Sequence, residues 1–324
     1  MSGARQQPLV SVVMIFWNAA TASPASPPTA FMDEAIRSVL DQALQPIELL
    51  LCDDGSEDAG TALARAWARR EPDRVRYLEH PSHGHAGMSA TRNLGVAAAK
   101  GRAVAFLDAD DVWLPEHLAR YWAKLEQHPE AAAVCGRALD RHSWDEAGNA
   151  DVWSELPWPS GTVVSPPAML TAVLRCGAYS TPMCSLLVRR EVVEELGGSE
   201  DAFTGMYEDQ VLLSKLYLTR TIVLEDSPTA WYRQHAGSST ARAIREGRYH
   251  PGAENPSREA FLRWLEHQQL TGAGPDSQLV AALQASLRPY NRWSARLAWR
   301  SLALARAWRR RARQALTRRG DRAS

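Results

Sequence analysis

The sequence predicts an α/β protein with a mostly parallel central sheet and helices on both faces. Short apolar segments rich in β-branched residues alternate with longer segments whose apolar residues recur every three or four positions. Strands that alternate with helices in this way form parallel sheets, because each helix carries the chain back across one face. The 324 residues are enough for one large domain followed by a smaller region.

The first half of the chain holds most of these elements. The residues at 10–17 form a β-branched apolar run, the residues at 31–42 have helical spacing, and Pro115 suits the first turn of a helix. We expect strands at 10–17, 47–52, 75–78, 103–107 and 131–135, and helices at 31–42, 59–70, 88–99 and 115–127. In open sheets of this type ligands bind beyond the carboxyl ends of the strands.

The pattern weakens after residue 136. A strand passes into a helix over 186–195, a helix follows Glu208, and a strand lies near 222–224. Residues 241–257 are polar and rich in Gly and Pro, which predicts a linker. Beyond them we expect helices near 258–269, 277–287 and 290–316.

Composition excludes several classes. Apolar residues make up 45% and charged residues 23% of the chain, as in globular proteins. The four cysteines lack metal-ligand spacing, and no stretch approaches 18 consecutive apolar residues. No signal peptide is evident, so we expect a cytoplasmic protein. Dinucleotide-binding, P-loop and serine-hydrolase motifs are also missing.

The most informative segment is Asp108-Ala109-Asp110-Asp111, directly after an apolar run. Side chains alternate along a strand, so Asp108 and Asp110 can point the same way. Two carboxylates facing one spot favour a divalent metal with phosphate oxygens. The alternative is a helix cap with solvated turn residues, because turns favour Asp. We assign Asp111 to the turn that leads into Trp113.

Two further segments follow expected strands at the same edge of the sheet. Asp53 and Asp54 come before a helix, and an acid there, Asp54 in particular, can accept hydrogen bonds from a nucleotide base or ribose. Arg92 lies in the first turns of the next helix, where it can reach phosphate oxygens or pair with a structural acid.

Two later polar segments carry less information by themselves. Asp209 follows Glu208 at the start of a helix, where acids are favoured by the helix dipole alone. His235 lies among hydroxyl side chains in a polar stretch after a strand, and a lone histidine in such a place is usually only exposed.

Taken in order, these segments resemble family 2 glycosyltransferases of the GT-A fold. The resemblance covers about residues 9–240. The segments that carry it are 10–18, 34–42, 51–56, 89–95, 106–115, 186–190 with Gly197-Gly198, 208–209 and 232–239. The loop at 19–30 is longer than is usual in this family, and Gln210-Val211 stands where the family often has another acid.

The resemblance implies a nucleotide-sugar donor, often a UDP-sugar, and transfer with inversion to a hydroxyl acceptor. In this reading Asp110 is a direct ligand of Mg²⁺ or Mn²⁺, and Asp108 is shared with the ribose. Asp54 contacts the base and His235 lies near the diphosphate or the metal. Asp209 is the catalytic base that takes the proton of the acceptor hydroxyl, as inverting chemistry requires.

Two other functions remain open at this point. A sugar-phosphate nucleotidylyltransferase has a similar sheet, but it needs a Gly-rich, Arg-containing loop that 18–30 does not supply. A nucleotide-sugar-binding protein with a silent site is disfavoured by the presence of Asp108, Asp110 and Asp209.

The acceptor is expected to be a glycan, a glycolipid or another hydroxyl compound. It would contact Trp144, Trp153 and Trp158 in the variable segment 137–206. The alternative is that these three residues form a small core under loops.

The chain divides at about residue 240 in this interpretation. The catalytic domain is 1–240, with a nucleotide-binding half at 9–136 and an acceptor half at 137–240, and 241–324 is a linker with basic helices. Residues 288–322 hold twelve Arg and one acid, a charge of +11 that offsets −11 elsewhere. Such a segment suits either an anionic inner membrane face or the acidic catalytic body. We expect no nucleic-acid partner, because no base-reading motif is present.

Overall fold

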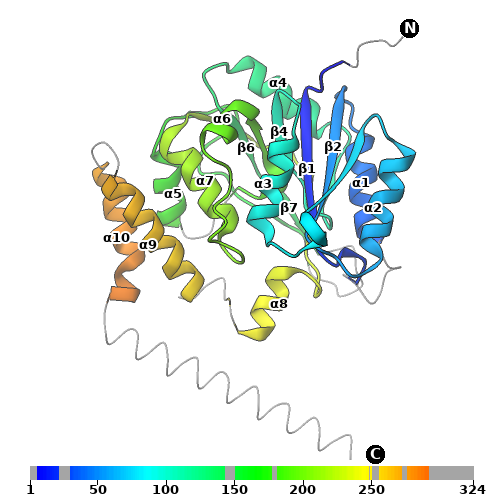
Figure 1. Cartoon of the computed structure of the whole chain (residues 1–324). Coiled ribbons are helices and arrows are strands. Elements are labelled where there is room, and N and C mark those ends of the chain that lie inside the picture. The colour runs from blue at the N-terminus through cyan, green and yellow to red at the C-terminus, as the bar shows by residue number, and fades with distance from the viewer. Residues whose placement is uncertain are drawn as a thin grey trace, which may run out of the picture. The chain divides into compact units, whose positions relative to one another are not determined.

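The computed structural model describes residues 6–21, 30–142, 150–176, 181–247, 249, 255–271 and 276–291. The chain divides into two compact units, residues 1–241 and 242–324 (Figure 1). Within the described ranges, no helix combines the length and the apolar character that crossing a membrane would require.

The first unit is built on an eight-stranded sheet with parallel strands at one side. The strand order is β3-β2-β1-β4-β10-β6-β11-β9. Strands β1 to β4 run parallel, whereas β10 is antiparallel to both of its neighbours, β4 and β6. The bounds are β1 (Val10–Phe16), β2 (Ile47–Asp53), β3 (Val75–Glu79), β4 (Ala103–Phe106), β6 (Ala133–Gly136), β9 (Val163–Val164), β10 (Leu186–Arg189) and β11 (Ile222–Glu225).

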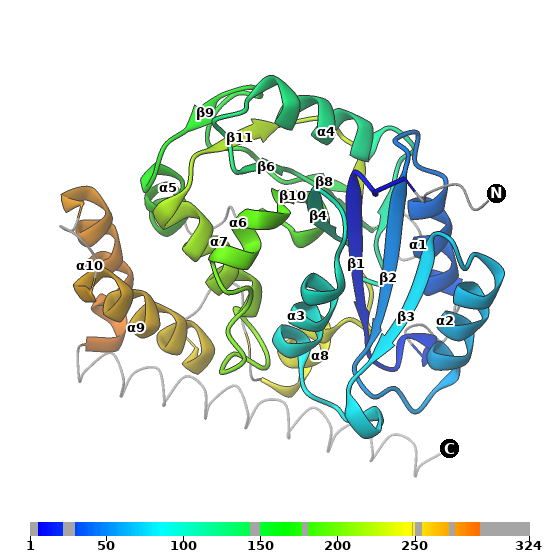
Figure 2. The same cartoon turned by 45° about the horizontal axis from the view of Figure 1, so that its top comes forward.

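Helices cover both faces of the parallel part, as the sequence predicts (Figure 2). Val12 and Met14 of β1 belong to the core that α1 and α2 close. Val13 points to the other face, where Gly95 of α3 lies so close that a Cβ there would be 2.4 Å from Val13 Cγ1. Because side chains along β1 point alternately to the two faces of the sheet, the same strand contributes to the core on both faces.

Most helices fall where the periodicity of the sequence places them. Their bounds are α1 (Ala30–Leu40), α2 (Ala59–Arg70), α3 (Met88–Ala98), α4 (His117–Gln127), α5 (Ala168–Cys176), α6 (Arg190–Glu195) and α7 (Glu208–Thr219). The remaining helices are α8 (Ser239–Glu246), α9 (Pro256–Thr271) and α10 (Ser277–Asn291). Most of the predicted Arg-rich helix at 290–316, and Trp144, lie outside the described residues.

The predicted linker at 241–257 was wrong over its first residues, which belong to α8. The Ser238 side-chain oxygen accepts the Ala241 N–H (3.1 Å), an N-cap interaction that starts the helix. Ala243 is 1% exposed, so the helix has a buried side. The helix was not predicted because most of its residues are polar or charged, so that its apolar spacing is weak.

A second sheet of four short strands lies beside the carboxylate segment. Its order is β5-β12-β7-β8, with β5 (Val112–Trp113), β7 (Leu139–Arg141), β8 (Val152–Trp153) and β12 (Ala230–Arg233). Strand β5 begins one residue after Asp111, and β12 ends two residues before His235. Their antiparallel pairing therefore brings these two segments of the chain together.

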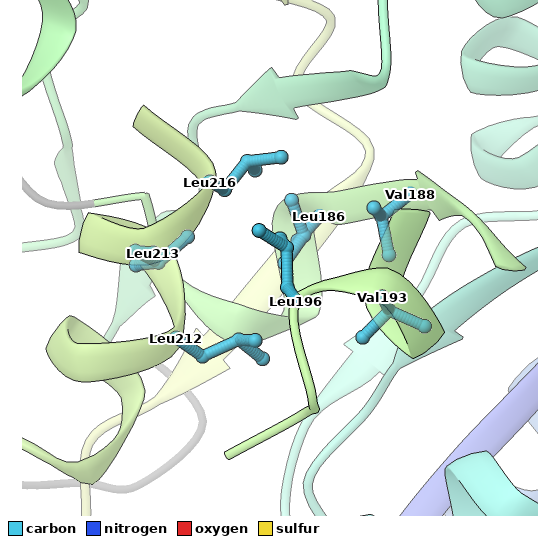
Figure 3. A pocket seen from close by; sticks show the side chains of 7 residues that line it. All are labelled: Leu186, Val188, Val193, Leu196, Leu212, Leu213 and Leu216. Carbon is cyan, nitrogen blue, oxygen red and sulfur yellow. The ribbon is translucent and has the colours of Figure 1, made fainter. Parts of the chain in front are cut away.

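A small apolar pocket lies where α6 and α7 pack on β10 (Figure 3). Its lining is Leu186, Val188, Val193, Leu196, Leu212, Leu213 and Leu216, all aliphatic. Because its lining is entirely aliphatic, we interpret this pocket as a packing feature of the first unit and not as a ligand site.

Candidate active site

Three carboxylates gather in the loop after β4. One oxygen each from Asp108, Asp110 and Asp111 lies within 4.8 Å of the others. The loop is turned by the Asp111 N–H, which donates to the Asp108 carbonyl oxygen (3.1 Å). Asp108 and Asp110 are partly exposed and Asp111 is 1% exposed. The sequence predicted a pair with Asp111 apart, whereas the structure places all three together.

The carboxylate cluster is electrostatically unfavourable without a cation. Burial, and then the charge of Asp110, raise the pKa of Asp108 to about 7, against the lowering effect of Arg92. Burial, followed by the charges of Asp110 and Asp108, raises the pKa of Asp111 well above its ordinary value. Negative charge at this place must therefore be relieved by protons or by a cation.

The residues present fit a divalent metal ion. Oδ2 of Asp111 is buried and has no hydrogen-bond partner among the described residues. Carboxylate oxygens are the ligands that Mg²⁺ and Mn²⁺ prefer. A buried, unsatisfied oxygen beside two partly exposed carboxylates is the arrangement expected of such a site.

The end of β12 and the residues directly after it bring two groups to this cluster. Nε2 of His235 lies 2.8 Å from Oδ2 of Asp110, and the histidine side chain is 2% exposed. The backbone N–H of Arg233 donates to Oδ1 of Asp111 (3.0 Å). The structure thus brings His235, a residue with little signal by itself, into contact with the predicted metal ligand.

The sequence did not indicate how this strand is held in place. The Arg233 guanidinium donates to Glu34 (2.7 Å) and lies 4.0 Å from the centre of the Phe31 ring. The same ring makes a T-shaped contact with the His235 ring, with 5.2 Å between the ring centres. The start of α1 therefore supports both residues that reach the carboxylates, Arg233 at the end of β12 and His235 just after it. Glu34 and Arg233 are 199 residues apart, a separation that no local pattern reveals.

Asp53 is buried within a hydrogen-bond network at the end of β2. Its Oδ1 accepts the Ser56 N–H (2.8 Å). Its Oδ2 accepts the hydroxyl groups of Thr61 (2.5 Å) and Tyr77 (3.0 Å). The side chain is 0% exposed, so the geometry gives Asp53 a role in shaping the loop before α2, and its nucleotide contact stays a prediction.

Asp54 organises the loop before α3. Its Oδ1 accepts the N–H groups of Ala86 (2.7 Å) and Gly87 (3.0 Å). Nδ1 of His85 lies 3.0 Å from Oδ2 of Asp54. The carboxylate is thus occupied by protein donors and the residue is 3% exposed. Its predicted contact with the base stays a prediction.

An exposed aromatic residue lies next to this loop. Trp17 directly follows β1, is 45% exposed, and packs against His85 in a tilted arrangement, with ring centres 4.9 Å apart and 36° between the ring planes. The apolar pattern placed Trp17 at the end of a predicted strand and indicated no role for it. Its position at the carboxyl end of a parallel strand is the signal that could have identified it.

Arg92 pairs with an acid from a distant part of the first unit. Its two terminal nitrogens bind the two carboxylate oxygens of Glu208, with 3.2 Å between Nη2 and Oε1. Arg92 is 2% exposed and Glu208 6%. Of the two partners considered from the sequence, a phosphate or a structural acid, the structure contains the acid, and the phosphate contact stays a prediction.

Asp209 lies in the first turn of α7. It is partly exposed, and its Oδ1 accepts the N–H of Gln210 (2.8 Å). The charges of Asp209 and Glu208 are among those that raise the pKa of Asp108. The proposed base and the carboxylate cluster therefore lie within electrostatic reach of each other.

Two solved structures illustrate proteins that share this fold. TarS of S. aureus, solved with UDP-GlcNAc, has a TM-score of 0.61 and 17% identity over 86% of this chain and 71% of that chain. The mannosyltransferase PcManGT of Pyrobaculum calidifontis, solved with GDP-Man and Mn²⁺, has a TM-score of 0.53 and 17% identity. That match covers 94% of this chain and 83% of the other. At such identities the likeness shows the fold, which is GT-A.

Sequence comparison identifies the family. The uncharacterized glycosyltransferase alr2836 of Nostoc is 28% identical over 232 residues, 69% of this chain and 68% of that protein. The putative glycosyltransferase EpsE of Bacillus subtilis is 29% identical over 186 residues, 56% of this chain and 62% of that protein. The family model described as Glycosyl transferase family 2 matches residues 11–196. The chain therefore belongs to glycosyl transferase family 2 and is a glycosyltransferase.

Proposed function

We propose that this protein transfers a sugar from a UDP-linked donor to a hydroxyl acceptor, with inversion and with a divalent metal. The observation that carries the proposal is the cluster of Asp108, Asp110 and Asp111, whose oxygens lie within 4.8 Å of one another. The contact of His235 with Asp110 supports it. A donor of the nucleotide-sugar type is supported by the family and by the ligands of TarS and PcManGT.

Asp110 and Asp108 would hold Mg²⁺ or Mn²⁺. When bound, the ion supplies a positive charge that stabilises the negative charge gathered on the leaving diphosphate. His235 orients Asp110 through its 2.8 Å contact, and the Arg233 N–H orients Asp111. These contacts fix the carboxylates before the donor arrives, so that little reorganisation is needed during the reaction.

Asp209 would act as the base. The acceptor oxygen forms its bond to the anomeric carbon while the bond from that carbon to the diphosphate breaks, and Asp209 takes the hydroxyl proton. Attack from the face opposite the leaving group inverts the configuration. A partly exposed carboxylate at the start of α7, in electrostatic reach of Asp108, suits this role.

The nucleobase would lie against Trp17. This ring is exposed at the carboxyl end of β1, and His85 fixes its orientation from one side. Aromatic rings of this kind stack on bases with an energy of about 1–3 kcal/mol per base. In this arrangement Asp54 shapes the binding site by holding the N–H groups of Ala86 and Gly87.

For the acceptor we propose a glycan or glycolipid of a cell-surface polysaccharide. The O-antigen biosynthesis protein RfbC of Myxococcus xanthus is 27% identical over 284 residues, 87% of this chain and 20% of that protein. Trp153, which is 37% exposed and lies under the Arg137 guanidinium, is a candidate sugar platform. The basic segment 288–322 would hold the protein at the cytoplasmic membrane face.

A donor screen tests this function. UDP- and GDP-sugars are incubated with the protein in Mn²⁺, Mg²⁺ or EDTA, and the release of nucleoside diphosphate is measured. We expect release from UDP-sugars in Mn²⁺ or Mg²⁺ and none in EDTA. Asp209→Asn should retain binding of UDP and lose turnover. Release that EDTA leaves unchanged, or full turnover by Asp209→Asn, would contradict the proposal.

A further inference from the structure

One face of α3 holds the segment that leads to Asp209. The hydroxyl of Ser89 donates to the carbonyl oxygen of Phe203 (2.7 Å). The amide of Asn93 donates to the Ser199 carbonyl oxygen (2.8 Å) and accepts the Ser199 N–H (2.8 Å). Residues three and four positions apart share one side of a helix, so Ser89, Arg92 and Asn93 all face the segment 199–208.

Another part of the surface of α3, around Gly95, rests on the central sheet. A Cβ at Gly95 would lie 2.4 Å from Val13 Cγ1 and 2.9 Å from Cys52 Sγ, so the helix lies directly on β1 and β2. Helix α3 thus connects the rigid, parallel part of the sheet with the loop before α7. Lys215 of α7 ties this loop from the other side, because it donates to the Gly198 carbonyl oxygen (3.0 Å).

Ser89 and Asn93 contact the loop before α7, whereas Arg92 contacts α7 itself. Its partner Glu208 directly precedes Asp209, and both members of the pair are buried. A buried charge that loses its partner is strongly unfavourable, so each of the two fixes the place of the other. Tyr207, which directly precedes Glu208, has a φ of 72°. A non-glycine residue keeps this left-handed conformation only when its surroundings impose it.

We propose that Arg92 is a positioning residue that, through Glu208, fixes the first turn of α7 and with it the catalytic base Asp209. In this account Arg92 makes no contact with the donor phosphates. The inference rests on the proposed function, since it takes Asp209 as the base. The interaction that does this is a single buried ion pair, Arg92 with Glu208, which joins the nucleotide-binding half to the acceptor half.

The test separates positioning from phosphate binding. Arg92→Met, Arg92→Lys and Glu208→Gln are compared with the wild-type protein in Mn²⁺ with UDP-GlcNAc and GDP-mannose as donors. The release of nucleoside diphosphate gives kcat, and calorimetry with UDP or GDP gives Kd. Arg102→Met is the matched control, because Arg102 pairs with Glu126 on the surface with 54% of its side chain exposed.

We expect Arg92→Met to lower kcat by about 100-fold, the loss typical of a small displacement of a reacting group. The Kd of the nucleotide should change by less than about threefold, because a group that acts only on the chemical step leaves ground-state binding intact. Arg92→Lys keeps the charge and should recover part of the loss. Glu208→Gln should lower kcat in the same way, and Arg102→Met should match the wild-type protein.

A rise in nucleotide Kd of about tenfold with unchanged kcat in Arg92→Met would overturn the inference and restore the phosphate role. Unchanged kcat in Glu208→Gln would overturn it as well, even if Arg92→Met fails to fold. If the wild-type protein releases no nucleotide from any donor, the proposed function fails and not this inference alone.

Discussion

Burial favours the uncharged form of an acid and of a base alike, and the described residues include an example of each. In the carboxylate cluster, burial and mutual repulsion favour the protonated acids Asp108 and Asp111 over the charged forms. His117 lies instead in an aromatic stack, with its ring 4.6 Å from that of Trp113 and 4.2 Å from that of Tyr121. Burial there lowers its pKa from the ordinary value of 6.5 to about 3.

His117 makes the stability depend on pH. Between its folded pKa of about 3 and its ordinary value of 6.5, the unfolded chain binds a proton that the folded protein does not. This contribution therefore decreases as pH falls from about 6.5 toward 3, by up to about 1.4 kcal/mol per pH unit. When the free energy of unfolding is measured with urea between pH 7 and 4, its decrease with falling pH should be smaller in His117→Phe than in the wild-type protein. An equal decrease in both proteins would refute the assignment of this pH dependence to His117.

Trp17 gives a second prediction for single residues. If the base stacks on this ring, Trp17→Ala should weaken UDP binding by about 1–3 kcal/mol, or roughly 5- to 150-fold in Kd. Trp153→Ala is the matched control, because Trp153 is also exposed, 37% against 45%, but lies in the second sheet. Calorimetry with UDP and Mn²⁺ measures both variants. Equal Kd values for the two would place the base elsewhere.

Candidate residues could be placed from sequence where they follow a strand or begin a helix. Asp108 and Asp110 follow β4, and Asp209 lies in the first turn of α7, as the sequence predicts, while their chemical roles stay predictions. Their partners could not, because these contacts join distant parts of the chain. Arg92 and Glu208 are 116 residues apart, and His235 and Asp110 are 125 apart. Whether a side chain is open to a ligand, as was expected of Asp54, depends on such distant donors.

The length of a helix or strand determined whether it could be predicted from the sequence. Helix α2 spans the predicted residues 59–70 and all five long strands of the first half were found, because several periods fit within each. Strands β5, β8 and β9 have two residues each, too few for any period. The reversed direction of β10 within a mostly parallel sheet is set by its neighbours and not by its own residues.

The close approach of α3 to the sheet can be tested at Gly95. Alanine is favoured over glycine in helices by about 1 kcal/mol. At Gly95, however, its Cβ would lie 2.4 Å from Val13 Cγ1, so overpacking should destabilise the protein by about 1–3 kcal/mol. Gly84→Ala, where the nearest atom is 3.4 Å away, is the control and should be near neutral. A stabilised Gly95→Ala protein in urea unfolding would contradict this packing.

For the whole molecule the unequal distribution of charge gives a prediction. Residues 292–322 hold eleven Arg and one acid, a net charge of +10. A chain that ends at residue 291, the last of α10, should pellet less with anionic vesicles than the full chain does. Neutral phosphatidylcholine vesicles are the control. Equal pelleting of both chains would show that this segment does not carry membrane binding.

The proposed function requires that the carboxylates after β4 hold a metal ion needed for sugar transfer. The direct measurement is the release of UDP from UDP-GlcNAc, and of GDP from GDP-mannose, as a function of Mn²⁺ concentration. It compares the wild-type protein, Asp110→Asn, and Asp140→Asn as a control in the second sheet. We expect saturable activation by Mn²⁺ in the wild-type and control proteins, and its loss in Asp110→Asn. Turnover that needs no metal and is unchanged in Asp110→Asn would contradict the account.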